Sequence, residues 1–453
     1  MAGLFALSIN SERYQGNFLD DLFWGTFYQQ HAGEAYSGLS TYNPERGKIK
    51  IRTHRGLFRP TFSNDLVGLE GTEGIGYCGT AREPFFVDSR LGELSACFSG
   101  NLINCPELID RFKDFGHTFE RGDDIEAITK LIVQRNNVIA GIEKVDEEIE
   151  GAYSLLLLTS EGIYVARCSS AHWPLVIGEK EGAVVAASEP GGFRNRGFKL
   201  VRSLEPGEIV LMKRGSYETK DRIVGHKIQF CSFFWVYSAF PNGVFEGIPA
   251  SLVRKRLGAT LARKDIERGF VPDIVIPIPD SGRFHAIGYH QEFCQQMNKG
   301  GVKRIPIYDE ALLKYSYAGR SFTPQTEEAR ELEARTKILG SGEDYYQGKE
   351  VVVCDDSVVR GVQTRSNLIP KLRTLGIKGI HLRISNPELR SHCPWGKTTK
   401  KGETLVSQFP SKEDRVQLLG IESLEYNTIE DLVRAIGLPR EKLCVDCDLG
   451  PPE

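Results

Sequence analysis

The sequence carries the stretch Lys349-Glu-Val-Val-Val-Cys-Asp-Asp-Ser-Val-Val-Arg-Gly-Val-Gln-Thr364, which decides the fold of the C-terminal half. It begins as a run of β-branched residues bounded by charge, which predicts a buried strand. The strand ends in two adjacent carboxylates, Asp355 and Asp356. A short loop with Gly361 follows, and residues 363–375 then predict a helix that Gly376 ends.

This order of elements indicates a site for a sugar phosphate. In an open α/β sheet, ligands bind beyond the carboxyl ends of the strands. A loop that leads into a helix offers N–H groups and the positive end of the helix dipole to a phosphate. The two carboxylates suit ribose hydroxyls or a bound Mg²⁺. An ordinary buried strand with a charged turn would explain the valines, but not two acids, a glycine and a threonine at these places.

Length and composition indicate a globular protein of two or three domains. The chain has 453 residues, of which 40% are hydrophobic and 26% charged. Its net charge of −3 gives no electrostatic reason to expect nucleic acid or an anionic membrane as a partner. We find no apolar run of transmembrane length and no basic lead of a signal peptide. Ten scattered cysteines do not suggest a secreted disulfide framework, so we expect the protein in the cytoplasm.

Two regions of different character follow one another along the chain. The first predicts an α+β layered domain over residues 1–222, from short strand-like runs between glycine turns at 3–9, 152–159, 162–166 and 182–187. The second, over residues 223–453, predicts an α/β domain with a mostly parallel sheet. Its strand candidates, which alternate with helical or loop stretches, are 275–279, 302–307, 350–354 and 379–384. The boundary is expected near residues 215–228.

The second region contains further polar segments. Ile274-Val-Ile-Pro-Ile-Pro-Asp-Ser-Gly282 predicts a strand that ends in a tight turn, and such a turn can present N–H groups to an anion. Lys314-Tyr-Ser-Tyr-Ala-Gly-Arg-Ser-Phe322 and Arg335-Thr-Lys337 are basic. Taken singly, each is best interpreted as a solvated loop.

Taken together and in order, these parts resemble the type I phosphoribosyltransferase domain of the amidophosphoribosyltransferases, also called glutamine phosphoribosyl pyrophosphate (PRPP) amidotransferases. The resemblance covers roughly residues 225–447. It implies that the pyrophosphate is bound by the turn Asp280, Ser281 and Gly282 and by the cations Arg320, Arg335 and Lys337. It also implies that Asp355 and Asp356 hold the ribose and Mg²⁺, and that the 5′-phosphate lies on Arg360, Gly361, Val362, Gln363 and Thr364. Among these, the expected catalytic residues are Arg335, Lys337, Asp355 and Asp356. One departure is Phe240, where the family usually has Arg.

The cysteines give a separate indication. Cys444-Val-Asp-Cys447 is a CxxC motif, which by itself fits zinc, redox chemistry or chance. One branch of the family carries a [4Fe–4S] cluster on cysteines at four landmarks, and this chain has Cys231, Cys393, Cys444 and Cys447 there. The resemblance therefore implies an iron–sulfur cluster, for which four thiolates form a complete shell. Zinc on the same four cysteines is the alternative.

The N-terminal region resembles the glutaminase domain of the same family, an N-terminal-nucleophile hydrolase, but its chemical groups differ. The family requires a cysteine directly after the initiator Met, and this chain has Ala2. A methyl group cannot be a nucleophile. Gly79 stands where the family has the arginine that holds the substrate carboxylate, and Ser99 stands where it has the oxyanion-hole asparagine. We therefore expect a degenerate glutaminase domain that serves as a scaffold or, less readily, binds another ligand.

The resemblance implies a homo-oligomeric enzyme, a dimer or tetramer, with PRPP and an amine such as ammonia as substrates. Two other functions stay open. The enzyme could use a different amine in specialised metabolism, or the chain could be a catalytically silent PRPP- or nucleotide-binding partner that regulates an active homologue. The cationic set of Arg320, Arg335 and Lys337 favours the enzyme, because a nucleotide sensor does not need a pyrophosphate clamp.

Overall fold

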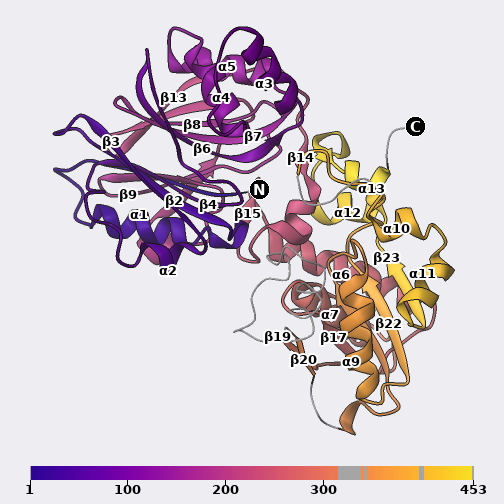
Figure 1. Cartoon of the computed structure of the whole chain (residues 1–453). Coiled ribbons are helices and arrows are strands. Elements are labelled where there is room, and N and C mark those ends of the chain that lie inside the picture. Colours follow the sequence, from indigo (N-terminus) through magenta and orange to yellow (C-terminus); the bar gives the residue numbers. More distant parts are fainter. Residues whose placement is uncertain (1, 315–337, 341–343, 397–401, 451–453) are drawn as a thin grey trace. The chain divides into compact units, whose positions relative to one another are not determined.

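The computed structural model describes residues 2–314, 338–340, 344–396 and 402–450, and Figure 1 shows their elements. The chain divides into two compact units. The first comprises Met1–Cys231 and the short segment Gly243–Gly247, and the second comprises Ser232–Asn242 and Ile248–Glu453. From the sequence, the boundary is expected after residue 222. In the structure the chain enters the second unit at Ser232 and returns once to the first.

The first unit is built on two antiparallel sheets. The larger sheet has the order β11-β9-β10-β1-β4-β2-β3. Its strands are β1 (Gly3–Ile9), β2 (Tyr36–Asn43), β3 (Lys48–Arg55), β4 (Glu73–Gly79), β9 (Val176–Lys180), β10 (Ala183–Ala187) and β11 (Lys199–Ser203). The other sheet has the order β13-β12-β8-β7-β6-β5. Its strands are β5 (Phe85–Ser89), β6 (Gly92–Leu102), β7 (Gly151–Thr159), β8 (Gly162–Arg167), β12 (Glu208–Lys213) and β13 (Ser216–Arg222).

Helices cover the outer faces of these two sheets (Figure 1). Those beside the larger sheet are α1 (Phe18–Phe27) and α2 (Phe58–Phe62). Those beside the other sheet are α3 (Cys105–Asp114), α4 (Asp124–Val133) and α5 (Val138–Glu148). Apolar side chains of both sheets, such as Leu4, Leu156 and Val165, form the core between them. The predicted α+β layered arrangement is therefore present.

The segment Gly243–Gly247 is fixed in the first unit by a buried arginine. Arg167, at the end of β8, is fully buried and lies 2.8 Å from Glu246 Oε1. Its guanidinium also donates to three carbonyl oxygens at 2.6–2.8 Å, those of Trp173, Leu204 and Ala171. It lies over the rings of Phe230 and Phe245, at 5.4 and 5.7 Å from their centroids. Each guanidinium nitrogen of Arg167 thus has a hydrogen-bond partner, and these partners offset the cost of burying its charge.

The second unit contains a parallel sheet with the order β18-β17-β21-β22-β23. Its strands are β17 (Ile274–Pro277), β18 (Ile307–Tyr308), β21 (Glu350–Asp355), β22 (Gly379–Ile384) and β23 (Ser423–Tyr426). The run 302–307 was predicted as a strand, but only its last residue is in one. Pro306 lacks the N–H of a ladder, and Ile305 is exposed. Other short strands of the second unit are β16 (Ile248–Pro249), β19 (Leu312–Lys314), β20 (Ile338–Gly340) and β24 (Leu443–Cys444), whereas the short strands β14 (Phe230–Cys231) and β15 (Val244–Phe245) belong to the first unit.

Helices pack on both faces of this sheet, because the central strand directs apolar side chains to both faces. Val352 and Cys354 of β21 pack with α6 (Ala250–Glu267) and α7 (Arg283–Asn298). Val351 and Val353 pack on the other face, with the π-helical turn η5 (Thr364–Leu368), α9 (Ile369–Thr374) and α11 (Lys412–Leu419). Among the described residues, the other helical segments of the second unit are η3 (Phe234–Ser238), α10 (Leu405–Gln408), α12 (Ile429–Ile436), α13 (Asp446–Leu449), η4 (Asp344–Tyr346) and η6 (Arg440–Lys442), and those of the first are η1 (Gln30–Ala32) and η2 (Arg194–Arg196).

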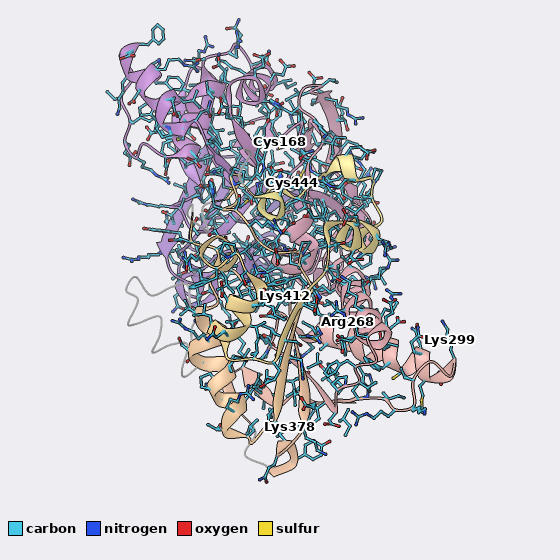
Figure 2. All side chains as sticks on the ribbon, turned by 90° about the vertical axis from the view of Figure 1, so that its right-hand side faces the viewer. Cys168, Arg268, Lys299, Lys378, Lys412 and Cys444 are labelled. Carbon is cyan, nitrogen blue, oxygen red and sulfur yellow. The ribbon has the colours of Figure 1, made fainter. Side chains whose placement is uncertain are left out.

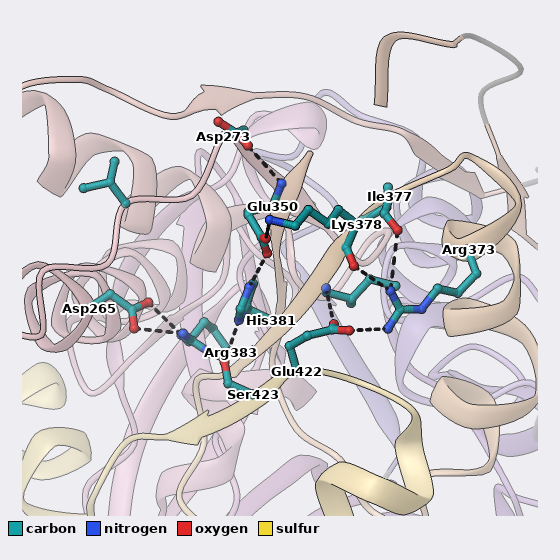
Figure 3. A network of polar contacts seen from close by, with 12 residues as sticks. Asp265, Asp273, Glu350, Arg373, Ile377, Lys378, His381, Arg383, Glu422 and Ser423 are labelled. Carbon is teal, nitrogen blue, oxygen red and sulfur yellow. Dashed lines mark hydrogen bonds and ion pairs between the residues drawn. The ribbon is translucent and has the colours of Figure 1, made fainter. Parts of the chain in front are cut away.

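A chain of polar contacts crosses three strands of the parallel sheet and reaches α6 (Figure 3). His381 Nε2 lies 2.9 Å from Glu350 Oε2, and His381 Nδ1 lies 2.9 Å from Ser423 Oγ. Arg383 donates to the same serine oxygen and, through two nitrogens, to both oxygens of Asp265 at 2.7 and 2.8 Å. Arg383 and Asp265 are both buried. This bidentate pair joins α6 to β22.

Several basic side chains of the second unit are labelled in Figure 2, namely Arg268, Lys299, Lys378 and Lys412. Arg268 and Lys412 both contact Glu425 Oε1, each at 2.7 Å. Lys378 lies 3.0 Å from Glu350 Oε1. Within the described ranges, no helix has the length and apolar character needed to cross a membrane.

Candidate functional site

The turn after β17 is held against the end of β21, so that residues 279–282 lie beside the two carboxylates. Ile278 continues the parallel pairing by donating its N–H to Cys354 O over 2.9 Å. The turn then closes with the Gly282 N–H on Ile278 O at 2.8 Å. A Cβ on Gly282 would stand 2.1 Å from Cys354 O, so only glycine fits at this close approach. α7 begins directly afterwards at Arg283.

Ser281 connects this turn to the acids at the end of β21. Its Oγ donates to Asp355 Oδ1 over 2.8 Å, and the same oxygen accepts the Asp356 N–H at 2.8 Å. Ser357 Oγ donates to Asp356 Oδ2 over 2.5 Å. Asp355 and Asp356 are both buried. The structure therefore brings the turn and the two carboxylates, which the sequence places far apart, into one connected cluster.

The two carboxylates differ from ordinary surface acids in their ionisation. Burial and the neighbouring charge of Asp356 hold the pKa of Asp355 well above its usual range. Burial also raises the pKa of Asp356. A cation bound beside such a pair would favour its ionised form. Two carboxylates completed by substrate oxygens are a common ligand set for Mg²⁺. The described part of the chain contains no group of three or more His, Cys, Asp or Glu side chains arranged to hold a metal by themselves.

Asp280, the first polar residue of the turn, faces cations. Lys314 Nζ lies 3.2 Å from its Oδ2, and Arg283 Nη1 lies 3.4 Å from its Oδ1. Arg283 also donates to both oxygens of Glu310, at 2.9 and 3.1 Å. These side chains are partly exposed, so each single contact contributes little to stability. The charges of the two cations are balanced by those of Asp280 and Glu310, so these four side chains carry no net positive charge.

The loop after the acids turns at a glycine whose backbone lies in the left-handed region. Gly361 has a φ of 72°, and its carbonyl accepts the Arg365 N–H at 2.9 Å as the helix begins. Thr364 is buried, whereas Val362 is partly exposed. Arg360 points to Glu403, with its Nε 3.1 Å from Glu403 Oε2. The helix then ends at Thr374, and Gly376 has a φ of 71°, as the sequence predicts for the residue that stops it.

The structure adds one residue to this neighbourhood that sequence reasoning missed. Arg254 of α6 is buried, and its charge lowers the pKa of Asp356 against the effect of burial. No motif marks this arginine, because charged residues of a surface helix normally face solvent. Of the expected cationic clamp, Arg320, Arg335 and Lys337 lie outside the described residues.

Three of the four cysteines expected to bind a metal lie in the second unit. Cys444 is buried, and Cys393 and Cys447 are partly buried. The segment that precedes Cys393 is hydrogen-bonded to that of Cys447. Arg390 and Ser391 donate their N–H groups to Cys447 O, at 2.8 and 3.1 Å. Burial raises the pKa of the Cys393 thiol, so a bound cation would be needed to hold it as a thiolate. The fourth, Cys231, is the last residue of the main segment of the first unit.

In the first unit, the expected glutaminase positions lie on neighbouring strands. Ala2, just before β1, donates its N–H to Ser99 Oγ of β6 over 2.9 Å. A Cβ on Gly79 would stand only 2.1 Å from the hydroxyl oxygen of Tyr77. That hydroxyl accepts the Ala81 N–H at 3.2 Å, and Tyr77 is buried. The Tyr77 side chain therefore occupies the space in which a side chain at position 79 would begin.

Two cysteines near these positions are unsuited to replace a nucleophile. Cys78 and Cys97 are fully buried, on β4 and β6 respectively. Burial raises the pKa of both thiols far above neutrality. A thiol reacts as its thiolate, so both are held in the unreactive form.

Comparison with known proteins gives the family. A glutamine amidotransferase domain model matches residues 77–195. The amidophosphoribosyltransferase of Methanocaldococcus jannaschii is 32% identical, over 99% of this chain and 97% of the relative. That of Methanothermobacter thermautotrophicus is 31% identical, over 97% of this chain and 92% of the relative. The structure of the Bacillus subtilis glutamine PRPP amidotransferase, complexed with ADP and GMP, superposes with a TM-score of 0.86 at 28% identity, and covers 98% of this chain and 96% of that one.

The fold agrees with the sequence relationship. The two antiparallel sheets of the first unit form a glutamine amidotransferase domain of the N-terminal-nucleophile type, and the parallel sheet of the second forms a type I phosphoribosyltransferase domain. A chain that aligns with these enzymes over nearly its whole length and shares both of their domains belongs to the amidophosphoribosyltransferase family.

Proposed function

We propose that this protein transfers the 5-phosphoribosyl group from PRPP to ammonia or another amine, with release of pyrophosphate, and does not hydrolyse glutamine. The observation that supports transfer is the cluster of Ser281, Asp355 and Asp356, in which the pyrophosphate turn and the ribose acids are hydrogen-bonded to each other. With ammonia the product is 5-phosphoribosylamine, an intermediate of purine synthesis. With another amine the enzyme would serve specialised metabolism.

The reaction needs orientation and charge stabilisation from the protein rather than a covalent intermediate. The amine nitrogen gives its lone pair to ribose C1, the C1–O bond to pyrophosphate breaks, and the added nitrogen loses a proton to solvent. Asp355 and Asp356 would hold the ribose hydroxyls and, when it is bound, a Mg²⁺ that neutralises charge on pyrophosphate. Ser281 and the N–H groups of its turn would bind pyrophosphate, and the loop from Arg360 to Thr364 would bind the 5′-phosphate.

Three features support the absence of glutamine hydrolysis. Ala2 offers a methyl group where the family has its nucleophilic thiol. Ser99 replaces the oxyanion-hole amide, and the loss of one such donor typically lowers the rate by ~10²–10³. Gly79 has no guanidinium for the substrate carboxylate, and Tyr77 fills the space beside it. The first unit would then act as a scaffold for the second.

The test is turnover of PRPP with Mg²⁺ and a supplied amine. Pyrophosphate release should rise with pH, because the unprotonated amine is the nucleophile. Asp355→Asn and Asp356→Asn should each lower it strongly, whereas Asp114→Asn, an exposed acid of α3, should not. PRPP binding without turnover on any amine would favour the regulatory partner instead. If the protein does not bind PRPP, the proposal is wrong.

We also propose a [4Fe–4S] cluster on Cys231, Cys393, Cys444 and Cys447, with zinc as the alternative metal. The hydrogen bonds between the segments of Cys393 and Cys447 and the partial burial of both thiols support these two members of the set. We further propose that the protein is a homo-oligomer, a dimer or a tetramer, and that it lies in the cytoplasm. Light scattering of the purified protein tests the oligomeric state, and fractionation of the source cells tests the location.

A further inference from the structure

We propose that Tyr237 and Phe240 form a binding surface for the acceptor amine, and that the preferred acceptor carries an aromatic ring. The inference rests on the proposed phosphoribosyl transfer and names the class of its second substrate. Both side chains are large and exposed, with 45% of Tyr237 and 49% of Phe240 accessible. Phe233 lies against Tyr237, with ring centroids 5.7 Å apart and ring planes inclined by 41°. These aromatic side chains come from one short segment of the second unit.

This segment is held rigidly by Arg254. The guanidinium donates to Trp235 O at 2.9 Å, Tyr237 O at 3.0 Å and Ala239 O at 2.7 Å. These carbonyls belong to the π-helical turn η3 and its C-terminal cap, where carbonyl groups need donors from outside the helix. Single π-helical turns are frequent at functional sites. A buried arginine with three backbone partners fixes the backbone on both sides of Tyr237.

The same arginine ties the segment to the phosphoribosyl site. His285 lies in the first turn of α7, immediately after the turn of Asp280, Ser281 and Gly282. Its Nδ1 lies 3.1 Å from Arg254 O, and its Nε2 lies 3.4 Å from Val236 O. The segment with Tyr237 therefore packs directly on the helix that begins at the pyrophosphate turn.

An aromatic surface at this place suits an acceptor better than it suits PRPP. Pyrophosphate, ribose hydroxyls and the 5′-phosphate are polar and are recognised by carboxylates, N–H groups and cations. Ammonia has no apolar surface to bury. An amine that bears an aromatic ring can bury that ring against Tyr237 and Phe240 and gain the preference of aromatic rings for inclined or offset packing.

The experiment compares benzylamine, methylamine and ammonia as acceptors, with PRPP, Mg²⁺ and pyrophosphate release as the readout. Rates are expressed per concentration of free base, so that differences in the protonated fraction of each amine cancel. We expect the kcat/KM for benzylamine to exceed that for methylamine at least tenfold. Phe240→Ala and Tyr237→Ala should each reduce this ratio about tenfold, equivalent to about 1.4 kcal/mol of aromatic contact. Phe115→Ala, which removes an exposed phenylalanine of the first unit, should leave the ratio unchanged.

The outcomes separate this inference from the function on which it rests. Turnover of ammonia with no preference for benzylamine over methylamine overturns the aromatic acceptor and leaves phosphoribosyl transfer standing. A lower oligomer mass of Phe240→Ala, without a change in the amine ratio, would show that a second copy of the chain covers these rings, and also overturns it. No turnover with any amine refutes both proposals together.

Discussion

At the scale of single residues, the glutaminase positions lead to a prediction about rescue. Ala2→Cys restores the missing thiol, but Ser99 and Gly79 still lack the oxyanion donor and the carboxylate-binding cation. We therefore expect glutamate release from glutamine by the Ala2→Cys variant to equal that of a no-enzyme control. Clear glutaminase activity in this single variant would show that the domain is intact apart from its nucleophile, and would contradict the proposed degeneracy.

Position 79 allows a second test at the same scale, because the space beside it is filled. In Gly79→Ala, the new Cβ would lie 2.1 Å from the Tyr77 hydroxyl, so Tyr77 must move and give up its bond to the Ala81 N–H. We expect overpacking of this kind to cost about 1–3 kcal/mol and to lower Tm. In a Tyr77→Ala background the same change should cost little, and this coupling between neighbours is measured by a double-mutant cycle. Equal costs in both backgrounds would show that Tyr77 does not fill the space.

The sequence predicts these residues unevenly. The strand, loop and helix around Asp355 and Asp356 follow from local order, because these elements must succeed one another in a parallel α/β domain. The hydrogen bond from Ser281 to Asp355 does not follow from it, since it spans 74 positions in the chain. Arg254 and Tyr77 were missed for a similar reason: their roles depend on which backbone lies against them, and no spacing pattern encodes that.

At the scale of elements, the ion pair between α6 and β22 is a strong constraint on the second unit. Asp265 and Arg383 are almost completely buried and are joined by two short hydrogen bonds. Asp265→Ala leaves a buried guanidinium without its counter-charge, and we expect unfolding of the second unit to become easier by about 3–5 kcal/mol. Replacing both partners, as Asp265→Leu with Arg383→Met, should recover most of this loss. Denaturant unfolding measures both variants, and a cost for the single variant that the double variant does not recover would contradict the ion-pair account.

The second prediction at this scale concerns the metal content of the cysteine segments. Protein purified without oxygen should be brown and contain about four irons per chain, as expected for a four-cysteine [4Fe–4S] centre. Cys393→Ser should lose most of this iron, because it removes one of four ligands. Cys294→Ser, which removes a partly buried thiol of α7, should retain the iron. A colourless protein that contains zinc would show that the alternative metal is correct.

Element boundaries show where sequence patterns stop being informative. The run of valines before Asp355 and the glycine after Leu375 predict β21 and the helix end well, because burial and a left-handed backbone each demand particular residues. The stretch 302–307 contains the β-branched residues Val302, Ile305 and Ile307, yet only Ile307 is in β18, which lies at the edge of the sheet. A strand at the edge of a sheet pairs on one side only and can be very short. Its edge position can be known only once the strand order is known.

At the scale of the whole molecule, the path of the chain between the units has a consequence for engineering and for recombination. A chimaera that joins residues 1–231 to a foreign transferase would omit Glu246 and Phe245, two of the groups around Arg167. The fully buried guanidinium would then keep its charge without its carboxylate. We expect such a chimaera to melt at a lower temperature than one that also carries the five residues 243–247, and Glu246→Gln in the natural chain to lose about 3 kcal/mol for the same reason. Crossovers that exchange one half of this protein should therefore succeed only when the donated half brings a suitable partner for the recipient's arginine.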